Sequence, residues 1–392
     1  MHVIACDGSP AAVAELRHAL DGVLAGGPAL APIGAGSDAD PVGSDPDPGH
    51  VVVTTSGSTG APKRVLLPAA ALRASAEATS RRLGGPGCWL LALPAQHVAG
   101  LQVLVRSALA GTDPGVLDLR GGFDPAAFAD AAGALMRRRS QTKARCYTSL
   151  VPTQLRRLLD DEPGALGGFD AVLLGGASAP PGLVARSRSL GIAVVTTYGM
   201  SETCGGCVYD GHPLDGVRVR LDGAQVRLDS AGRIELAGPA LASGYLDRPG
   251  DPAFRDGWFR TSDLGRLGAD GSLQVLSRVD DVVVTGGVNV VPAEVEAVLA
   301  ADPTIAVACV VGIPDPIWGQ RLVAAVVPAD SDRPPAAARV LAAVRDRLSG
   351  PQTPKELLVV GALPLRDVGK PDRHAVAELL RRELAGNLHP EA

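Results

Sequence analysis

Long apolar runs, basic clusters and lysine are all scarce in this chain of 392 residues. No stretch approaches the ~18 uninterrupted apolar residues of a membrane span, and Met1–Leu20 has no signal-peptide core, so we expect a soluble, cytoplasmic protein. The net charge is −5 without a long basic run, which disfavours nucleic acid or an anionic membrane as a partner.

The 37 basic residues include four lysines: Lys63, Lys143, Lys355 and Lys370. A lysine that persists among so many arginines is a candidate for a required amine, which draws attention to Lys63 and Lys370.

Cysteine is also too sparse for a disulfide framework. The six cysteines are Cys6, Cys88, Cys146, Cys204, Cys207 and Cys309. They are scattered along a long chain, so we expect reduced thiols. Cys204-Gly-Gly-Cys207 lacks the second Cys/His pair of a zinc site and the preceding thioredoxin-like strand of a redox motif. We therefore expect a structural role for both residues.

The length of the chain suggests two or three domains, and the order of its apolar and breaker segments predicts an α/β protein. Residues 31–49 are rich in Gly, Pro, Asp and Ala, which predicts a flexible loop, and order should resume at His50. Short apolar runs then alternate with amphipathic helices as far as about residue 200, which favours mostly parallel sheets flanked by helices. Alternating runs at Val217–Leu221, Gln225–Leu228 and Arg233–Leu236 predict a small β subdomain.

A second α/β segment follows Arg278. A helix is predicted over Pro292–Leu299, strands near 305–311 and 321–327, and helices near 335–348 and 372–384. We therefore place a large N-terminal domain at 1–279 and a smaller α+β domain at 280–392.

The segment Thr54–Val65 has the composition of a phosphate-binding loop. Gly57 and Gly60 allow consecutive N–H groups to turn inward as an anion nest, and Lys63 adds a mobile positive charge. Five hydroxyl side chains surround the same spot: Thr54, Thr55, Ser56, Ser58 and Thr59. The spacing is not that of a Walker loop, because Gly60 is followed by Ala-Pro-Lys rather than Lys-[Ser/Thr]. From composition alone, an ordinary Ser/Gly-rich surface turn remains equally acceptable.

Five motifs later in the chain favour the phosphate-binding interpretation of this loop over an ordinary turn. In order they are Tyr198-Gly-Met-Ser-Glu202, Trp258-Phe-Arg-Thr-Ser-Asp-Leu264, Ser277-Arg-Val-Asp-Asp281, Gly286-Gly-Val-Asn289 and Gly369-Lys-Pro-Asp372. The set resembles the adenylate-forming superfamily of acyl-CoA synthetases, luciferases and peptide-synthetase adenylation domains, over roughly residues 50–385.

This resemblance implies an ATP site and a magnesium ligand. The implied nucleotide-binding residues are Thr54, Thr55, Ser56, Gly57, Ser58, Thr59, Gly60, Lys63, Gly175, Gly176, Ala177, Ser178, Tyr198, Gly199, Met200, Ser201, Asp263 and Arg278. Tyr198 would lie against the adenine, and Gly175–Ser178 would form a second adenine-side turn. Asp263 and Arg278 would bind the ribose. Ser201 replaces a more usual threonine and would still reach the α-phosphate. Glu202 would hold Mg²⁺, a hard cation that prefers carboxylate and phosphate oxygens.

The resemblance also implies a mobile C-terminal domain with two working positions. Lys370 matches the catalytic lysine, which would bridge the carboxylate nucleophile and the α-phosphate as the acyl-adenylate forms. Asp280 matches the hinge position. In the second position, the loop that contains Gly286 and Gly287 would replace Lys370 and help to form the channel for the thiol of coenzyme A.

The segment from Leu93 to Ser107 indicates which acid is activated. It is similar to the acid-pocket motif of bacterial o-succinylbenzoate–CoA ligases of menaquinone (vitamin K2) biosynthesis, including a basic residue nine positions after the histidine. A buried ring carboxylate needs a cation or several donors, and Arg106 would supply one. His97 would wall the acyl pocket or donate to the substrate. The alternatives are a helix-surface arginine and a helix-capping or core histidine.

One departure from the family pattern concerns the N-terminus, because only 53 residues precede the loop and most relatives have well over a hundred. A shortened N-terminus is compatible with bacterial o-succinylbenzoate ligases, and a partner subunit or homodimer could restore missing structure.

The leading hypothesis is an AMP-forming acid–CoA ligase that uses ATP, Mg²⁺ and coenzyme A. The alternatives are a ligase for another small acid, an inactive nucleotide-binding homologue, and an ADP-forming kinase or NTPase.

Overall fold

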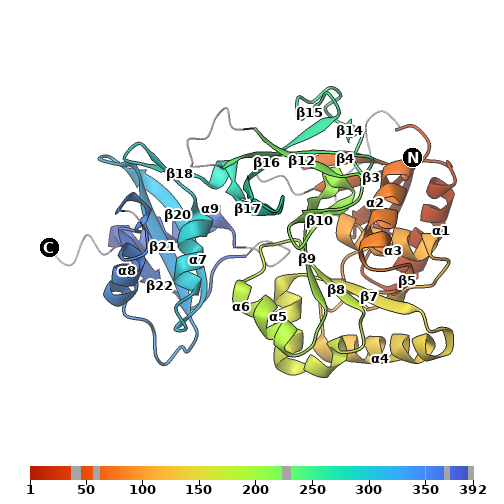
Figure 1. The fold of residues 1–392 in the computed structure, drawn as a ribbon, viewed down its shortest axis with the longest axis horizontal. Coiled ribbons are helices and arrows are strands. Elements are labelled where there is room, and N and C mark those ends of the chain that lie inside the picture. The colour runs from red at the N-terminus through yellow and green to blue at the C-terminus, as the bar shows by residue number, and fades with distance from the viewer. Residues whose placement is uncertain (37–45, 56–61, 223–230, 349, 366–370, 387–392) are drawn as a thin grey trace. The chain divides into compact units, whose positions relative to one another are not determined.

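The chain forms two compact units in the computed structural model (Figure 1). The structure describes residues 1–36, 46–55, 62–222, 231–348, 350–365 and 371–386. The first unit comprises Met1–Arg220, Glu235–Thr261 and Ala269–Leu273, and the second comprises Leu221–Ile234, Ser262–Gly268 and Gln274–Ala392. The division at Asp280 into 1–279 and 280–392 stays a prediction. In the part of the chain that is described, no helix combines the length and apolar character required to cross a membrane.

A five-stranded sheet in the order β1-β2-β3-β4-β14 begins the first unit. Its strands are β1 His2–Cys6, β2 Leu30–Gly34, β3 His50–Thr55, β4 Lys63–Pro68 and β14 Gly244–Tyr245. β2 corrects the expected loop at 31–49: it pairs in parallel with β1, and Leu30 and Ala31 are buried. Pairing with β1 and β3 thus makes this segment a strand despite its local Gly/Pro-rich composition. Residues 37–45 of that loop lie outside the described residues, and β3 begins at His50 as predicted.

A seven-stranded sheet has the order β11-β10-β9-β8-β7-β5-β6. Its strands are β5 Gly87–Leu91, β6 Gly115–Val116, β7 Arg145–Leu150, β8 Ala171–Leu174, β9 Val194–Met200, β10 Gly205–Tyr209 and β11 His212–Pro213. β6, β5, β7, β8 and β9 run parallel, whereas β10 and β11 return antiparallel. The predicted parallel sheet is confirmed.

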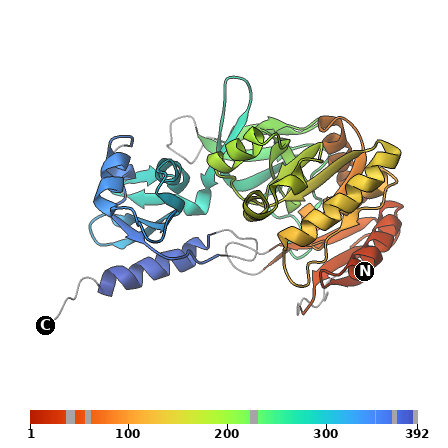
Figure 2. The ribbon, with the colours of Figure 1, turned by 90° about the horizontal axis from the view of Figure 1, so that it is seen from below.

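Helices cover both faces of this sheet, because alternate residues of a strand point to opposite sides. The helices are α1 Pro10–Leu24, α2 Ala69–Arg82, α3 Val98–Leu109, α4 Pro125–Thr142, α5 Pro152–Asp161 and α6 Pro181–Ser189. Trp89, Leu91 and Tyr147 pack in one core with α1, α2 and α3. Leu90 and Cys146 pack in the other core, with α4 and α5, which are in front in Figure 2.

The predicted β subdomain is a sheet in the order β12-β13-β16-β15, with β17 paired to β16. Its strands are β12 Arg218–Asp222, β13 Gly232–Ala237, β15 Phe254–Arg255, β16 Trp258–Leu267 and β17 Leu273–Arg278. The strands expected at Val217–Leu221 and Arg233–Leu236 are confirmed within about one residue. The one expected at Gln225–Leu228 lies outside the described residues.

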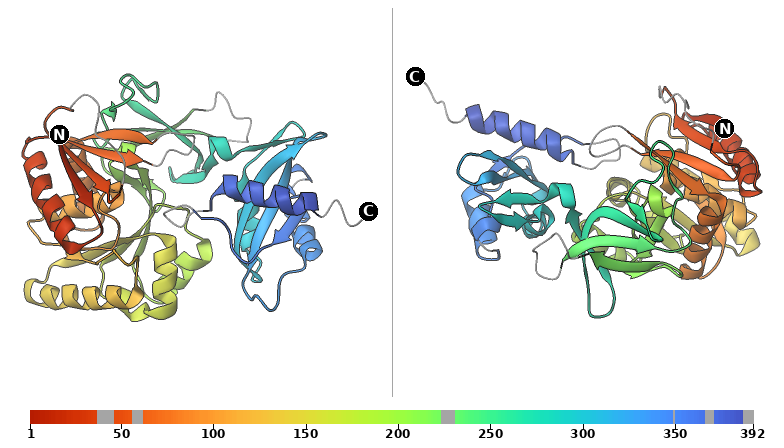
Figure 3. Two further views of the ribbon diagram at one scale, coloured as in Figure 1. Left: turned by 180° about the vertical axis from the view of Figure 1, so that it is seen from behind. Right: turned by 90° about the horizontal axis from the view of Figure 1, so that it is seen from above.

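The second unit has its own sheet, in the order β19-β18-β21-β20 with β22 paired to β21. Its elements are β18 Val283–Thr285, β19 Val288–Val290, α7 Pro292–Ala300, β20 Ile305–Asp315, β21 Gly319–Pro328, α8 Ala337–Arg345, β22 Glu356–Val359 and α9 Arg373–Gly386. α7 and α8 pack with Val310 and Leu322. α9 packs through Val376 against Cys309 and Val323 and lies across the strands in the left view of Figure 3. The predicted α+β architecture is confirmed.

Arg373 anchors the start of α9 within this unit. Its Nη1 and Nη2 donate to the two carboxylate oxygens of Glu296 on α7 at 2.6 and 2.9 Å, and Nη1 also donates to the carbonyl of Val310 at 2.7 Å. Its Nε lies 3.3 Å from Oδ2 of Asp281, in the short 3₁₀ helix Val279–Asp281. One guanidinium therefore joins α9, α7, β20 and the predicted hinge segment.

Arg373→Ala is expected to destabilise the second unit by about 3 kcal/mol, because it leaves two partly buried carboxylates without their cation. Hydrogen exchange of the amides of α9 and β20 measures this effect locally. Arg382→Ala, on the exposed face of the same helix, is the control and should change protection little. Equal protection in the two variants would contradict the anchoring role of Arg373.

Candidate active site

The described ends of the phosphate loop face each other on two paired strands. β3 and β4 are antiparallel, with Thr55 opposite Lys63, and Thr55 Oγ1 donates to the carbonyl of Lys63 at 3.3 Å. Thr54 precedes Thr55 at the end of β3. The remaining predicted loop residues, Ser56, Gly57, Ser58, Thr59 and Gly60, lie outside the described residues. The hydroxyl of Thr55 and the side chain of Lys63 therefore lie on directly opposite residues of two paired strands.

Tyr245 contacts both Lys63 and Glu202, the charged residues predicted to bind phosphate and Mg²⁺. Its hydroxyl donates to Oε1 of Glu202 at 2.8 Å, and the Nζ of Lys63 lies 4.7 Å from the centroid of its ring. Tyr245 is only 3% exposed. Burial and the neighbouring carboxylate of Glu202 raise the pKa of Tyr245 above its ordinary value, so the phenol stays protonated. The structure therefore brings Lys63 and Glu202 to one side chain that sequence reasoning did not select.

The Tyr198 motif forms a hairpin that has no room for side chains at its glycines. β9 and β10 pair with Gly199 opposite Gly206, and a Cβ on Gly199 would lie 2.0 Å from the carbonyl oxygen of Gly205. Met200 ends β9, and Ser201, which is 8% exposed, starts the short 3₁₀ helix Ser201–Thr203 that holds Glu202. Close backbone packing therefore carries the chain from Tyr198 to Glu202 in one fixed turn.

The second predicted adenine-side turn lies beside this hairpin. Gly175 N–H donates to the carbonyl of Leu150 at 3.1 Å, and a Cβ on Gly175 would lie 2.3 Å from Thr197 Oγ1. Gly176 has a φ of +76°, which favours glycine. Ala177 and Ser178 continue the turn. These residues follow β8, and Tyr198 follows Thr197 on β9, so both predicted adenine contacts come from neighbouring strands at their carboxyl ends.

Cys204 and Cys207 are buried beside the same hairpin. They are 0% and 2% exposed, and both are free thiols. Burial raises the pKa of Cys207 to about 12 and raises that of Cys204 as well, so neither is a thiolate at neutral pH. Among the residues described, no cluster of three His, Cys, Asp or Glu side chains has the geometry to hold a metal. The burial of both thiols agrees with the expected structural role.

His97 and Arg106 lie at opposite ends of α3. His97 is the N-cap residue and is exposed, whereas Arg106 is 7% exposed near the last turn. Nine residues of helix separate them by about 13 Å along the axis. They therefore cannot bind the same small group, and any ligand shared by them must present two separate groups.

Arg106 is a buried cation that has no acidic partner among the residues that the structure describes. Its guanidinium stacks over the ring of Trp89 at 4.9 Å, and Nη2 donates to Thr79 Oγ1 at 3.4 Å. Its Nε, like Oε1 of the nearby Gln102, is buried without a hydrogen-bond partner. Burial lowers the pKa of Arg106, and the one neighbouring group that raises it is Tyr209 rather than a carboxylate. A carboxylate at this place would supply the missing countercharge.

The predicted ribose ligands lie in the second unit. Asp263 is on β16, and Arg278 ends the neighbouring strand β17. Within the described residues, the buried Nε of Arg278 has no hydrogen-bond acceptor, so this N–H is available to a ligand. Asp280 is exposed in the 3₁₀ helix that follows.

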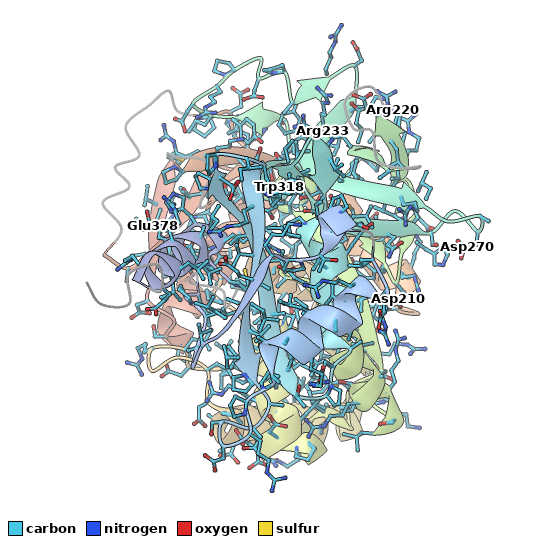
Figure 4. All side chains as sticks on the ribbon, turned by 90° about the vertical axis from the view of Figure 1, so that its left-hand side faces the viewer. Asp210, Arg220, Arg233, Asp270, Trp318 and Glu378 are labelled. Carbon is cyan, nitrogen blue, oxygen red and sulfur yellow. The ribbon has the colours of Figure 1, made fainter. Side chains whose placement is uncertain are left out.

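The predicted coenzyme A loop is the β18–β19 turn. Gly286 and Gly287 have φ values of +56° and +78°, and the Gly286 N–H donates to the carbonyl of Trp318 at 2.9 Å. Trp318, labelled in Figure 4, lies just before β21 and is 42% exposed. A Cβ on Gly286 would lie 2.8 Å from the Trp318 ring, so glycine is required there. Lys370 lies outside the described residues.

The residues present fit a Mg²⁺ ion held jointly with phosphates. Proteins that bind Mg²⁺ with nucleotides commonly use one or two carboxylates and leave the remaining positions to phosphate and water. Glu202 would supply one such carboxylate, and its Oε1 accepts a hydrogen bond from the Tyr245 hydroxyl.

Sequence reasoning missed Tyr245 and Gln102. Tyr245 is one of only four tyrosines in a chain with 3% aromatic residues, and this scarcity marks each tyrosine as a candidate functional residue. Gln102 follows His97 by five positions in an apolar helix, but nothing in the sequence distinguishes a buried amide from a surface one.

Comparison with known proteins gives consistent matches along the chain. The sequence profile of AMP-binding enzymes matches residues 7–246, and that of the AMP-binding enzyme C-terminal domain matches 294–370. A Mycobacterium tuberculosis protein named probable 2-succinylbenzoate–CoA ligase is 48% identical over 337 residues, which cover 85% of this chain and 84% of that protein.

Solved structures agree with the sequence comparison. The o-succinylbenzoate CoA synthetase of Bacillus subtilis with its acyl-adenylate intermediate is 29% identical with a TM-score of 0.70, over 83% of this chain and 68% of that one. The same enzyme in complex with ATP and a magnesium ion is 27% identical with a TM-score of 0.70, over 92% and 81% of the two chains.

Proposed function

Because the chain belongs to the AMP-binding enzyme family, we propose that it is an AMP-forming acid–CoA ligase whose acid is 2-succinylbenzoate, also called o-succinylbenzoate. The 48% identity to a protein of that name supports the choice of acid. The observation that carries the reaction type is the meeting of Lys63 and Glu202 at Tyr245, next to the Tyr198 hairpin. A carboxylate for a hard cation and an ammonium for phosphate are what ATP chemistry requires.

The proposed reaction has two steps. In the first, the succinyl carboxylate attacks the α-phosphorus of ATP, and pyrophosphate leaves with the electrons of the broken P–O bond. In the second, the thiol of coenzyme A releases its proton to solvent and its sulfur attacks the acyl carbon, and AMP leaves with the electrons of the broken acyl C–O bond. Bound Mg²⁺ would neutralise phosphate charge during the first step.

Each predicted residue has one task in this scheme. Lys63 and the Thr54–Gly60 loop would hold the leaving pyrophosphate, and Glu202 would hold Mg²⁺. Tyr198 and the Gly175–Ser178 turn would bind adenine, with Ser201 at the α-phosphate. Asp263 and Arg278 would bind the ribose hydroxyls.

The C-terminal segment would serve both steps. Lys370 would stabilise the charge that develops between the carboxylate and the α-phosphate. A change of backbone dihedrals at Asp280 would then replace Lys370 by the Gly286–Gly287 turn for thioester formation.

The two ends of α3 match the two ends of the proposed acid. 2-Succinylbenzoate carries one carboxylate that reacts and one on the ring that stays charged. Arg106 has no acidic partner in the described part of the chain and would take the ring carboxylate, while His97 would lie toward the reacting end. A cytoplasmic location, a homodimer and the absence of a nucleic-acid partner remain predictions of the sequence.

ATP–pyrophosphate exchange with a panel of acids tests the proposal. We expect exchange with 2-succinylbenzoate at least tenfold faster than with benzoate, succinate or a medium-chain fatty acid. Faster exchange with one of the other acids would keep the reaction type and overturn the acid. No exchange with any acid would favour an inactive nucleotide-binding homologue.

A further inference from the structure

Lys63 and Glu202 carry opposite charges and both contact Tyr245, yet no ion pair joins them within the described chain. Lys63 lies over the face of the ring, and Glu202 accepts from the hydroxyl at the ring's edge. The residues come from β4, from the 3₁₀ helix Ser201–Thr203 and from β14. β14 is fixed beside β4, because Gly244 and Tyr245 pair with Leu66 and Val65.

The local backbone holds this arrangement from several sides. The amide of Ala242 donates to the carbonyl of Glu202 at 2.9 Å, three residues before Tyr245. The ring of Phe254 packs edge-on against Tyr245 with centroids 5.4 Å apart. Tyr245 is 3% exposed and packed in this way, so its side chain has one orientation. Its hydroxyl and its ring face therefore offer fixed contact points to the side chains of Glu202 and Lys63.

A direct Lys63–Glu202 pair would be unfavourable for nucleotide binding. An ammonium paired with a carboxylate loses much of its attraction for phosphate, and the carboxylate loses its affinity for a cation. A ring face attracts an ammonium without neutralising it, and a phenol donates to a carboxylate without removing its charge. Tyr245 thus keeps both charges available.

On the basis of the proposed function, we propose that Tyr245 is a positioning residue that holds Glu202 toward the metal and Lys63 toward the pyrophosphate group of Mg²⁺-ATP, and prevents the two from pairing. The hydroxyl serves Glu202 and the ring serves Lys63. The two halves of one side chain therefore have separable effects.

Two substitutions separate these effects. Tyr245→Phe keeps the ring beneath Lys63 and removes the hydroxyl, whereas Tyr245→Leu removes both. Calorimetric titration with ATP, with and without Mg²⁺, reports binding independently of catalysis. For Tyr245→Phe we expect ATP affinity without Mg²⁺ to be unchanged and the gain in affinity on adding Mg²⁺ to fall about tenfold. For Tyr245→Leu we expect metal-free ATP affinity to fall as well, by severalfold.

A double variant tests whether the hydroxyl acts through Glu202. Glu202→Gln removes the charge that binds the metal, so adding Tyr245→Phe to it should reduce the Mg²⁺-dependent gain no further. Tyr147→Phe is the matched control, because Tyr147 is a buried tyrosine whose hydroxyl donates to the carbonyls of Leu83 and Gly85. It should leave both titrations unchanged.

The outcomes distinguish this inference from the proposed function. If the unaltered chain binds Mg²⁺-ATP but Tyr245→Phe keeps the full Mg²⁺-dependent gain, the positioning role is wrong and the proposed function stands. An equal loss with and without Mg²⁺ in Tyr245→Phe, or additive effects with Glu202→Gln, would also overturn the role. If the unaltered chain gains no ATP affinity from Mg²⁺, the proposed function fails and the inference fails with it.

Discussion

Lys370→Ala is expected to lower the rate of ATP–pyrophosphate exchange by at least about 100-fold while ATP affinity changes little. The reason is that a cation placed between the attacking carboxylate and the α-phosphate acts mainly on charge that develops in the transition state, and removing one such group typically costs 10²–10³-fold in rate. A rapid-quench measurement of acyl-adenylate formation, with saturating ATP and 2-succinylbenzoate, measures the affected step.

The second half-reaction provides an internal control for the same variant. Pre-formed acyl-adenylate supplied with coenzyme A should give thioester at close to the normal rate, because Lys370 acts only while the adenylate forms. Lys143→Ala is the matched lysine control, because Lys143 is exposed at the C-cap of α4. Lysine and alanine both carry a Cβ, so this substitution leaves the strain of the left-handed backbone unchanged. Equal losses in both half-reactions would contradict the assigned role of Lys370.

Arg106→Met is expected to lower kcat/KM for 2-succinylbenzoate by about 100-fold, chiefly through KM. Methionine fills similar space over the Trp89 ring but cannot bind a carboxylate, and hydrogen bonds to a charged group typically contribute 1.5–3 kcal/mol. The stability of the free protein should be unchanged or higher, because a buried cation without an acidic partner has been removed. Steady-state kinetics and a urea titration measure the two effects.

A truncated substrate sharpens this test. 3-Benzoylpropionate has the same keto-acid chain without the ring carboxylate, so Arg106→Met should use it as well as the unaltered chain does. An unchanged KM for 2-succinylbenzoate, combined with a large loss of stability, would show that Arg106 is a structural cation instead.

The parallel sheet was predictable because its strands are short apolar runs between amphipathic helices, and burial on both faces requires that pattern. Leu90 and Trp89 illustrate it, since adjacent residues of β5 enter different cores. β2 was not predictable, because the pairing of Leu30–Gly34 between β1 and β3 is decided by residues distant in sequence.

The local conformation of the candidate site was predictable where a short motif decides it, although the roles of its residues stay predictions. The Gly286–Gly287 turn depends on glycines that the sequence displays directly, whereas the pairing of Gly199 with Gly206 appears only in the structure. The role of Tyr245 depends on a contact with Glu202 across 43 positions and one with Lys63 on a neighbouring strand, which no local pattern encodes. The burial of Arg106 without a countercharge was likewise visible only after folding, because a single arginine in an apolar helix is compatible with either face.

The most direct test of the proposed function is one incubation of the purified chain with 2-succinylbenzoate, ATP, Mg²⁺ and coenzyme A, analysed by mass spectrometry and nucleotide chromatography. We predict one equivalent of AMP and one of the 2-succinylbenzoyl-CoA thioester, with neither formed when the acid is omitted. Formation of ADP in place of AMP, or release of AMP without the thioester, would contradict it.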